Sequence, residues 1–179
     1  MARYAALLRG VNVGNAQLAM ADLRRLVTDL GHTDVKTYLQ SGNVVFTSPP
    51  TDGEVLAEGI AKRLADELGL RVPVLVRDAG ELAAVVDASP YAGRQDDPTR
   101  VLVAFLSAAP APARARELAV PAGEDMEYAL TGREVHLHFP TGRYGRTKFT
   151  NTYLEKVLGV AATVRNWKSV LALRDLTAG

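Results

Sequence analysis

One order of hydrophobic patterns occurs twice along this chain, and the repetition restricts the folds open to it. A continuous apolar run at residues 4–8 is followed by a helical pattern that ends at Gly31, and then by two alternating runs around a turn at residues 41–43. A second helical pattern over residues 56–68, a short strand and a further helix complete the first half. After residue 99 the same order returns, so each half reads strand, helix, strand, strand, helix, strand, helix.

Short segments also match between the halves. Val76-Arg77-Asp78 before one helix resembles Val164-Arg165-Asn166 before another, and Gly42 and Gly132 fall at the turns of corresponding hairpins. A strand–helix–strand–strand–helix–strand order is that of the ferredoxin-like α/β plait. We therefore predict an α+β fold of two tandem ferredoxin-like α/β plaits (βαββαβ repeats) packed together.

The boundary between the halves is expected in residues 89–99, where Pro90 and Pro98 interrupt both kinds of periodicity. This predicts a first plait subdomain over residues 1–92 and a second over residues 93–179, packed as one compact unit. A chain of 179 residues is long enough to bury a core without disulfides or metals.

Composition excludes several classes of protein. The chain has no cysteine, which rules out disulfides, thiolate nucleophiles and thiolate metal ligands. It has no run of about 18 apolar residues, so neither a membrane-spanning helix nor a membrane partner is expected. The start, Met1-Ala-Arg-Tyr, leads directly into a strand pattern and predicts no signal peptide. We expect a cytoplasmic protein.

Charge is unevenly distributed although the net charge is only +1. Residues 133–174 contain eight Lys and Arg against the two acids Glu134 and Glu155. A basic C-terminal third suggests an anionic partner, either a small molecule or a nucleic acid. The alternative is a solvated surface on which long basic side chains cover apolar area.

Polar residues gather at one end of the first predicted sheet. In a plait, the loop after the first strand and the tip of the central hairpin lie at the same end of the sheet. Arginine offers a fork of donors, asparagine and serine donate or accept, and glycine allows close backbone approach. The predicted ligand-binding residues here are Arg9, Asn12, Gly14, Tyr38, Gln40, Ser41, Gly42 and Asn43. The alternative is that they only satisfy turn geometry and brace the two loops.

A second cluster is expected at the opposite end of the second sheet, where residues 141–148 approach the end of the last strand. Thr147 is predicted to cap a helix over residues 148–158, and a helix start beside glycines and cations favours an anion. The predicted ligand-binding residues here are Arg143, Gly145, Arg146, Lys148, Arg165, Asn166 and Trp167. The alternative is a basic but unoccupied helix start.

The tryptophan and two of the histidines each allow two structural interpretations. Trp167 is predicted to pack between the two halves, with a stacking platform for a base as the alternative. His136 and His138 share one face of a strand, and we expect them to face solvent rather than to bind metal, because no third ligand has suitable spacing. No nucleophile elbow or Ser-His-Asp order is found, so no catalytic residue is assigned.

Four motifs, in this order, resemble a bacterial family of unknown function, the domain-of-unknown-function 1697 family. They are residues 9–14 (Arg-Gly-Val-Asn-Val-Gly), residues 38–46 (Tyr-Leu-Gln-Ser-Gly-Asn-Val-Val-Phe), the Gly-x-x-Gly-x-x-Lys run ending at Lys148, and Arg165-Asn-Trp167. The resemblance covers essentially the whole chain. The chain departs from the family at Asn15, where the family has Gly, and at residues 147–149, where it tends to have Ser-Lys-Leu. The resemblance implies a pair of plait subdomains and no assigned activity.

Three functions are compatible with these patterns. The first is a cytosolic module that binds an anionic ligand through its loop clusters, namely a nucleotide, a phospho-metabolite or a nucleic-acid backbone. The second is a small-molecule enzyme in which Arg9, Tyr38, Arg143, Lys148 and Arg165 hold a phosphorylated or carboxylated substrate. The third is a structural or interaction protein. No cofactor and no metal is expected, and the sequence does not determine the oligomeric state.

Overall fold

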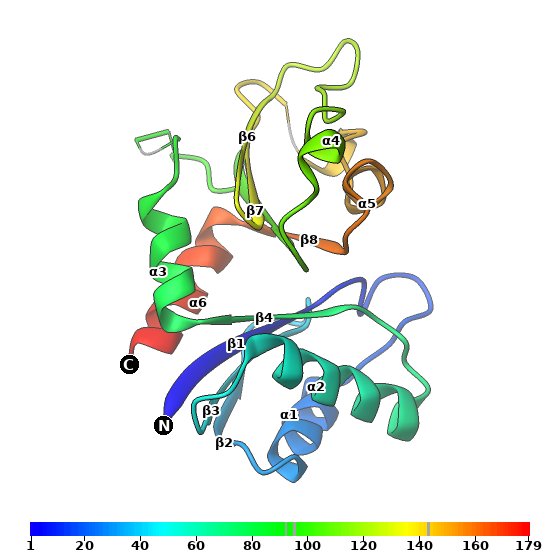
Figure 1. Ribbon diagram of the computed structural model, residues 1–179, viewed down its shortest axis with the longest axis vertical. Helices are drawn as coiled ribbons and strands as arrows, with labels where there is room; N and C mark the ends of the chain where they lie inside the picture. The colour runs from blue at the N-terminus through cyan, green and yellow to red at the C-terminus, as the bar shows by residue number, and fades with distance from the viewer. Residues whose placement is uncertain (92, 95, 143) are drawn as a thin grey trace. The chain divides into compact units, whose positions relative to one another are not determined.

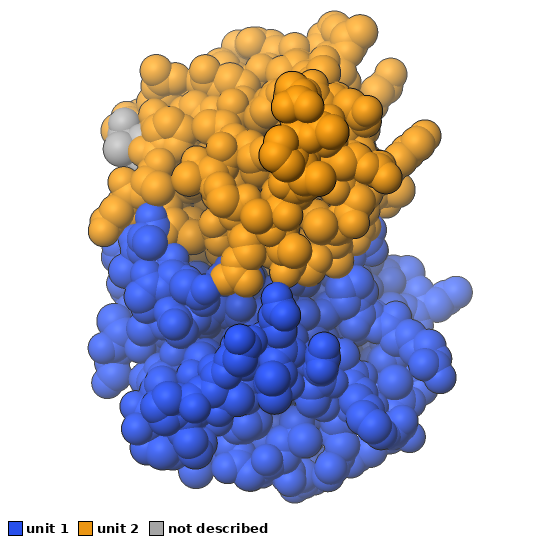
Figure 2. Space-filling model, viewed as in Figure 1, with its two compact units in different colours: residues 1–84, 172–179 blue, residues 85–171 orange. Residues whose placement is uncertain are grey.

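The computed structural model describes residues 1–91, 93–94, 96–142 and 144–179. They form two compact units (Figure 2): unit 1 comprises residues 1–84 with residues 172–179, and unit 2 comprises residues 85–171. Each unit contains one four-stranded sheet in which every neighbouring pair is antiparallel. The predicted α+β fold of two ferredoxin-like plaits is confirmed.

Unit 1 has the strand order β2-β3-β1-β4. Its elements are β1 (Ala2–Leu8), α1 (Met20–Asp29), β2 (Thr33–Thr37), β3 (Asn43–Ser48), α2 (Gly53–Leu68) and β4 (Val74–Asp78). The next helix, α3 (Ala79–Asp87), begins in unit 1 and ends in unit 2. Because β1 pairs with both β3 and β4, it is the central strand that the apolar run at residues 4–8 predicts.

The core of unit 1 lies between its sheet and helices α1 and α2, which cover one face of that sheet (Figure 1). Strand alternation directs Tyr4, Ala6 and Leu8 of β1 toward these helices. From the other side, Leu26 of α1 and Ile60 of α2 are completely buried in the same cluster. The predicted helical stripes therefore form the core.

Helix α2 has a different N-cap from the predicted one. The Asp52 carboxylate accepts a hydrogen bond from the Glu54 N–H at 2.7 Å, whereas the Thr51 hydroxyl donates to the Pro49 carbonyl. Thr51 and Glu54 have the sequence spacing of a capping box, which predicts Thr51 as the cap, and this prediction is wrong. Asp52 is one residue closer to the first turn, and its charge also complements the helix dipole. The end of α2 is as predicted, with Gly69 in the left-handed region at φ 65°.

Unit 2 has the strand order β6-β7-β5-β8. Its elements are β5 (Val101–Leu106), α4 (Pro112–Ala115), β6 (Glu127–Thr131), β7 (Glu134–His138), the 3-10 turn η1 (Tyr144–Arg146), α5 (Asn151–Leu158) and β8 (Ala162–Asn166). The last helix, α6 (Trp167–Ala178), begins in unit 2 and ends in unit 1. The core contains Leu102, Ala104 and Leu106 of β5 with Leu154 and Leu158 of α5.

The two strand-to-helix junctions that match in sequence also match in structure. Arg77 and Arg165 are both buried, and each donates to the carbonyl of the preceding valine, at 3.1 and 3.0 Å. Asp78 caps α3 by accepting from the Glu81 N–H at 2.8 Å, and Asn166 caps α6 by accepting from the Ser169 N–H at 2.9 Å. The sequence spacing of Asp78 and Glu81 predicts a cap for this helix, and the structure confirms it, because the Glu81 carboxylate also accepts from the Asp78 N–H at 2.9 Å.

No helix in the described part of the chain combines the length and the apolar character needed to cross a membrane.

Candidate functional site

Asn12 joins the two predicted loops of unit 1. Its amide nitrogen donates to the carbonyls of Leu18 and Gln40 at 3.0 and 2.6 Å, and its amide oxygen accepts from the Leu18 N–H at 2.8 Å. Its φ of 58° lies in the left-handed region, which asparagine tolerates better than most residues. The Asn12 amide therefore hydrogen-bonds to backbone groups of the protein itself.

The hairpin tip between β2 and β3 is held in the same way. Asn43 is fully buried, and its amide nitrogen donates to the Tyr38 carbonyl at 2.8 Å and to the Ser41 hydroxyl oxygen at 2.9 Å. The Leu8 N–H donates to the Gly42 carbonyl at 2.8 Å, which fastens the tip to the end of β1. The prediction that the two loops share one end of the sheet is confirmed.

Gly42 lies where the hairpin tip closely approaches Leu8 and Val11. Its φ is +87°, and a Cβ atom added there would lie 2.5 Å from Val11 Cγ2 and 2.9 Å from Leu8 Cβ. Both the backbone conformation and the space therefore require glycine at this position.

The other predicted residues of this cluster lie on the same two loops. Arg9 is half-buried, and its N–H donates to the Pro73 carbonyl at 3.0 Å. Gly14 and Gln40 are exposed, and the Gln17 amide donates to the Gly14 carbonyl at 3.0 Å. Since the asparagine amides are directed at the protein's own backbone, the geometry of this cluster favours a brace between loops over a ligand site.

Unit 2 contains a hollow of about 810 Å³. It lies at the end of the sheet opposite the β6–β7 hairpin, where β7 and β8 end and β5 begins. Its lining residues are Thr99, Leu102, Thr141, Gly142, Tyr144, Gly145, Arg146 and Asn166. Three residues of the predicted second cluster, Gly145, Arg146 and Asn166, are thus brought together as expected.

Two carboxylates fasten the loop that borders the hollow. Glu124 accepts from the Thr147 hydroxyl and, at 3.0 Å, from the Lys148 N–H. Asp125 accepts from the Thr141 hydroxyl at 2.8 Å. A carboxylate of the chain itself therefore occupies the backbone donor at Lys148 that the sequence assigned to an external anion. These acids line a smaller adjoining hollow of about 270 Å³, which Arg146 also borders.

Arg146 and Asn166 keep donors available at the hollow. The exposed Arg146 guanidinium has no hydrogen-bond or ion-pair partner among the described residues. Asn166 uses its amide oxygen to cap α6, so the NH₂ group of the same side chain is left for other acceptors. Lys148 is exposed but does not line the hollow.

Arg165 and Trp167 are placed differently from Asn166. Alternation along β8 puts Arg165 on the opposite face of the sheet, where it donates to the Thr163 hydroxyl oxygen at 2.6 Å. Burial lowers the pKa of Arg165 to about 10, so the side chain is still charged at neutral pH. Trp167 is only 6% exposed, which favours packing over a stacking platform. The predicted residue Arg143 lies outside the described residues.

The helix after the loop starts later than predicted. Thr150 caps α5 by accepting from the Tyr153 N–H at 3.2 Å, and the helix begins at Asn151 rather than at residue 148. Thr147 is therefore not the cap, because its hydroxyl proton is donated to Glu124 and its oxygen accepts from the Phe149 N–H. Residues 144–148 therefore precede the helix, and the 3-10 turn η1 is among them.

Several lining residues carried no signal in the sequence. Thr99 falls in the expected linker, Leu102 looks like ordinary core, and Tyr144 lies inside a motif chosen for its glycines and cations. Glu124 and Asp125 come from the segment before β6, which has no periodic pattern. Their approach to the loop depends on tertiary folding, and spacing alone does not reveal it.

At the corresponding end of unit 1, a tyrosine takes the place of a leucine that lines the hollow in unit 2. Tyr4 pairs with Asp78 in unit 1 at the position where Leu102 pairs with Asn166 in unit 2. The Tyr4 hydroxyl makes 3.0 Å hydrogen bonds with both the carbonyl and the N–H of Thr51. With leucine in place of tyrosine and a longer loop between strand and helix, unit 2 keeps an open space at this position.

The histidines of β7 do not face solvent, so that expectation is wrong. His136 is 1% exposed and His138 9%, because the sheet face opposite Val135 and Leu137 is also buried. His138 Nδ1 lies 2.7 Å from Glu127 Oε1, whereas His136 Nδ1 has no hydrogen-bond partner in the described structure. Across the described ranges, no group of three or more His, Cys, Asp or Glu side chains could hold a metal ion.

Burial of His136 predicts a pH-dependent stability. Desolvation lowers the pKa of His136 in the folded protein, so the unfolded chain binds a proton at higher pH than the folded one. The stability that comes from neutral His136 is present above about pH 6.5 and is lost as the pH falls below it, with a slope of at most about 1.4 kcal/mol per pH unit. Urea unfolding at pH 7.5 and 5.5 should therefore show a smaller decline for His136→Leu than for the wild type. An equal decline in both proteins would contradict this assignment.

Known proteins share this fold and part of this sequence. A structure described as that of "conserved bacterial protein SP0830 from Streptococcus pneumoniae" is similar, with a TM-score of 0.74 over 98% of each chain and 24% sequence identity. This likeness shows the shared fold. A search of the curated proteins found no match. The sequence pattern of "Protein of unknown function (DUF1697)" matches residues 1–136, which is most of the chain. The chain therefore belongs to the DUF1697 family.

Proposed function

We propose that this protein binds an anionic small molecule in the hollow of unit 2. The observation that carries the proposal is the Arg146 guanidinium, which lines the hollow and has no partner among the described residues. Arginine pairs with carboxylates and phosphates through two parallel hydrogen bonds. The NH₂ group of Asn166, on the same lining, is a second donor for such a ligand.

The dimensions and chemistry of the hollow support binding of a small molecule. Its volume of about 810 Å³ falls within the range of small-molecule sites, roughly 300–1,000 Å³. Leu102 supplies apolar surface, and the threonines and Tyr144 supply hydroxyl groups. The described lining contains neither a carboxylate nor an imidazole, so we propose binding rather than acid–base catalysis.

A nucleic-acid backbone fits this surface less well. Glu124 and Asp125 border the adjoining hollow beside Arg146, and their charges repel a continuous row of phosphates. Binding to nucleic acid would weaken steeply with salt, with a slope set by the number of phosphates contacted.

Ligand-induced stabilisation tests the proposal. A panel of phosphorylated and carboxylated metabolites is added to the protein, and thermal unfolding is followed by fluorescence. At ten times its Kd, a ligand specific for the folded state adds about 1.4 kcal/mol, which raises the Tm of a protein of this size by about 3–5 °C. We expect such a shift with one class of anion. A panel without any shift would contradict the proposal.

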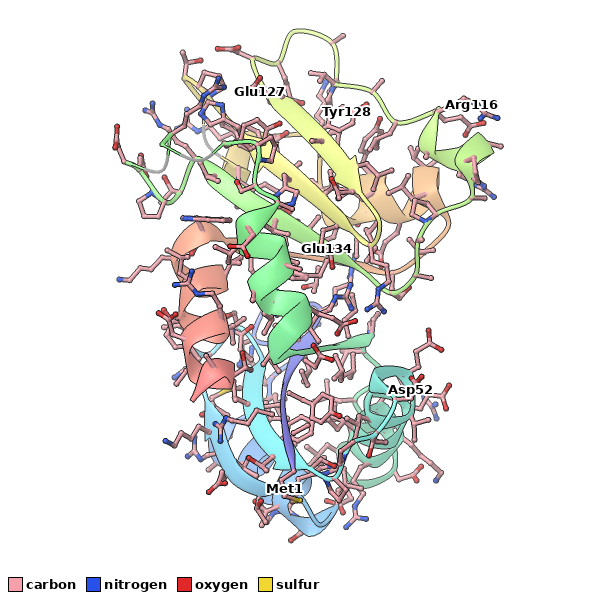
Figure 3. All side chains as sticks on the ribbon, turned by 60° about the vertical axis from the view of Figure 1, so that its left-hand side comes forward. Met1, Asp52, Arg116, Glu127, Tyr128 and Glu134 are labelled. Carbon is pink, nitrogen blue, oxygen red and sulfur yellow. The ribbon has the colours of Figure 1, made fainter. Side chains whose placement is uncertain are left out.

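Replacing Arg146 with alanine should weaken binding of that anion about 10- to 150-fold, because a hydrogen bond to a charged group contributes about 1.5–3 kcal/mol. Unfolding without ligand should be nearly unchanged, since Arg146 is exposed and has no partner among the described residues. Arg116→Ala is the matched control, because Arg116 is another exposed arginine of unit 2, at the end of α4 (Figure 3). Equal losses of affinity in the two variants, measured by calorimetric titration, would argue against a site at Arg146.

A further inference from the structure

We infer that the anion bound in the hollow of unit 2 also carries hydroxyl donors of its own, as a polyol phosphate does. This inference rests on the proposed function and narrows its ligand class. The observation behind it is the way in which two threonine hydroxyls, those of Thr99 and Thr141, are oriented by neighbouring carboxylates at the lining of the hollow.

The Thr99 hydroxyl is directed at Asp97. Thr99 Oγ1 donates to Asp97 Oδ1 at 2.5 Å, and the Thr99 N–H donates to the same oxygen at 2.9 Å. The other carboxylate oxygen of Asp97 forms an ion pair with Arg100, with 3.4 Å between Oδ2 and Nε. The only proton of this hydroxyl is therefore used within the loop, and its oxygen can only accept a further hydrogen bond.

The Thr141 hydroxyl is oriented in the same way on the other bordering loop. Thr141 Oγ1 donates to Asp125 Oδ2 at 2.8 Å. Its oxygen therefore also offers only lone pairs to a ligand. Two threonines of the lining, on two different loops, therefore have hydroxyl oxygens that can only accept further hydrogen bonds.

Two other residues of the lining, Asn166 and Arg146, offer hydrogen-bond donors. Asn166 gives its amide oxygen to the Ser169 N–H at 2.9 Å, which leaves its NH₂ group as a donor. Arg146 has only donors. A complementary ligand must therefore place acceptors against Arg146 and Asn166, and donors against Thr99 and Thr141. A bare or alkyl anion meets the first requirement, but it displaces water from the threonine oxygens without replacing those hydrogen bonds, which lowers affinity.

Two phosphate monoesters of equal carbon number separate these cases. Glucitol 6-phosphate carries hydroxyl donors along its chain, and hexyl phosphate carries none. Titration calorimetry on the full chain should give a Kd for glucitol 6-phosphate about 10- to 100-fold lower than that for hexyl phosphate, as expected for two additional hydrogen bonds. The apolar surface of Leu102 favours the alkyl chain of hexyl phosphate, so tighter binding of hexyl phosphate would contradict the inference.

Variants at the two threonines locate the effect. Thr99→Val and Thr141→Val should each weaken binding of glucitol 6-phosphate about 3- to 10-fold and leave hexyl phosphate unchanged, which also shows that the variants are folded. Thr99→Ser and Thr141→Ser keep the hydroxyl and should bind like the wild type.

The outcomes distinguish this inference from the proposed function. If hexyl phosphate binds as tightly as glucitol 6-phosphate, and Arg146→Ala weakens both, the hydroxyl requirement is wrong and the anion site stands. If Arg146→Ala changes neither affinity, the site at Arg146 is refuted and this inference with it. If neither ester binds at roughly 10 mM, ten times the upper end of ordinary KM values, this inference is wrong, and the panel of anions decides whether the site stands.

Discussion

Replacing Gly42 with alanine is expected to lower the free energy of unfolding by about 2–5 kcal/mol. Two effects combine at this position. The added Cβ atom would meet Val11 Cγ2 at 2.5 Å and Leu8 Cβ at 2.9 Å, and the φ of +87° is unfavourable for any residue with a Cβ. Relief of the contact would require moving the hairpin tip away from β1, which would break the hydrogen bond from the Leu8 N–H to the Gly42 carbonyl.

Gly14→Ala is the matched control for this substitution. Gly14 lies on the adjoining loop of unit 1 with a φ of +60°, but no atom lies within 4 Å of the position that a Cβ would occupy. It should therefore show only the backbone penalty, about 1–2 kcal/mol. Urea unfolding followed by circular dichroism measures both variants. Equal losses of stability would show that the close approach of the hairpin to Leu8 and Val11 has no energetic consequence.

Asn12→Ala is expected to lower the free energy of unfolding by about 2–4 kcal/mol. The substitution removes the hydrogen bonds to both backbone groups of Leu18 and to the Gln40 carbonyl, and it puts alanine at a φ of 58°. The Leu18 N–H and carbonyl, next to a buried side chain, would then have no hydrogen-bond partner among the described residues. A large loss without any effect on ligand binding is the result expected of a brace.

Two further substitutions divide the effect of Asn12 into its parts. Asn12→Gly removes the amide but keeps the left-handed backbone accessible, so it should be less destabilising than Asn12→Ala by about 1 kcal/mol. Asn15→Ala, on the same exposed loop, should change stability by less than about 0.5 kcal/mol, because Asn15 is exposed and makes no side-chain hydrogen bond among the described residues. If Asn15→Ala and Asn12→Ala were equally destabilising, the brace would be refuted.

The fold could be predicted because its two halves repeat a single order of local patterns. The apolar run of β1, the stripes of α1 and α2, and the glycines at turns and helix ends are all local signals that the tertiary structure retains. The match between Val76-Arg77-Asp78 and Val164-Arg165-Asn166 was the most specific sequence signal of the repeat. Those segments form equivalent junctions, down to the arginine hydrogen bond and the helix cap.

Details of the candidate site could not be predicted, because they depend on contacts between segments distant in sequence. Thr147 has the residue type of a helix cap, but Glu124 accepts its hydroxyl proton and Thr150 caps α5 instead. Arg165 was grouped with Asn166 by adjacency, although neighbouring strand residues point to opposite faces of a sheet. Strand alternation was therefore a signal that could have separated these two residues.

The difference between the two units is the main reason for proposing the ligand site in unit 2 and not in unit 1. The Tyr4 hydroxyl hydrogen-bonds to Thr51 at one end of the unit 1 sheet, whereas Leu102, at the matching position, lines a hollow in unit 2. The other polar cluster, around Asn12 and Asn43, directs its amides at the backbone. Of the two clusters, the hollow alone combines open volume with an arginine that has no partner among the described residues.

The most direct test is a residue-level titration with the anion that stabilises the protein. Amide chemical shifts of ¹⁵N-labelled protein are recorded as that anion is added. We predict saturable shifts at Gly142, Gly145, Arg146 and Asn166, with residues 9–15 and 38–43 unchanged, and loss of the response in Arg146→Ala. Saturable shifts confined to residues 9–15 and 38–43 would place the site in unit 1 and contradict the division into a brace and a binding hollow.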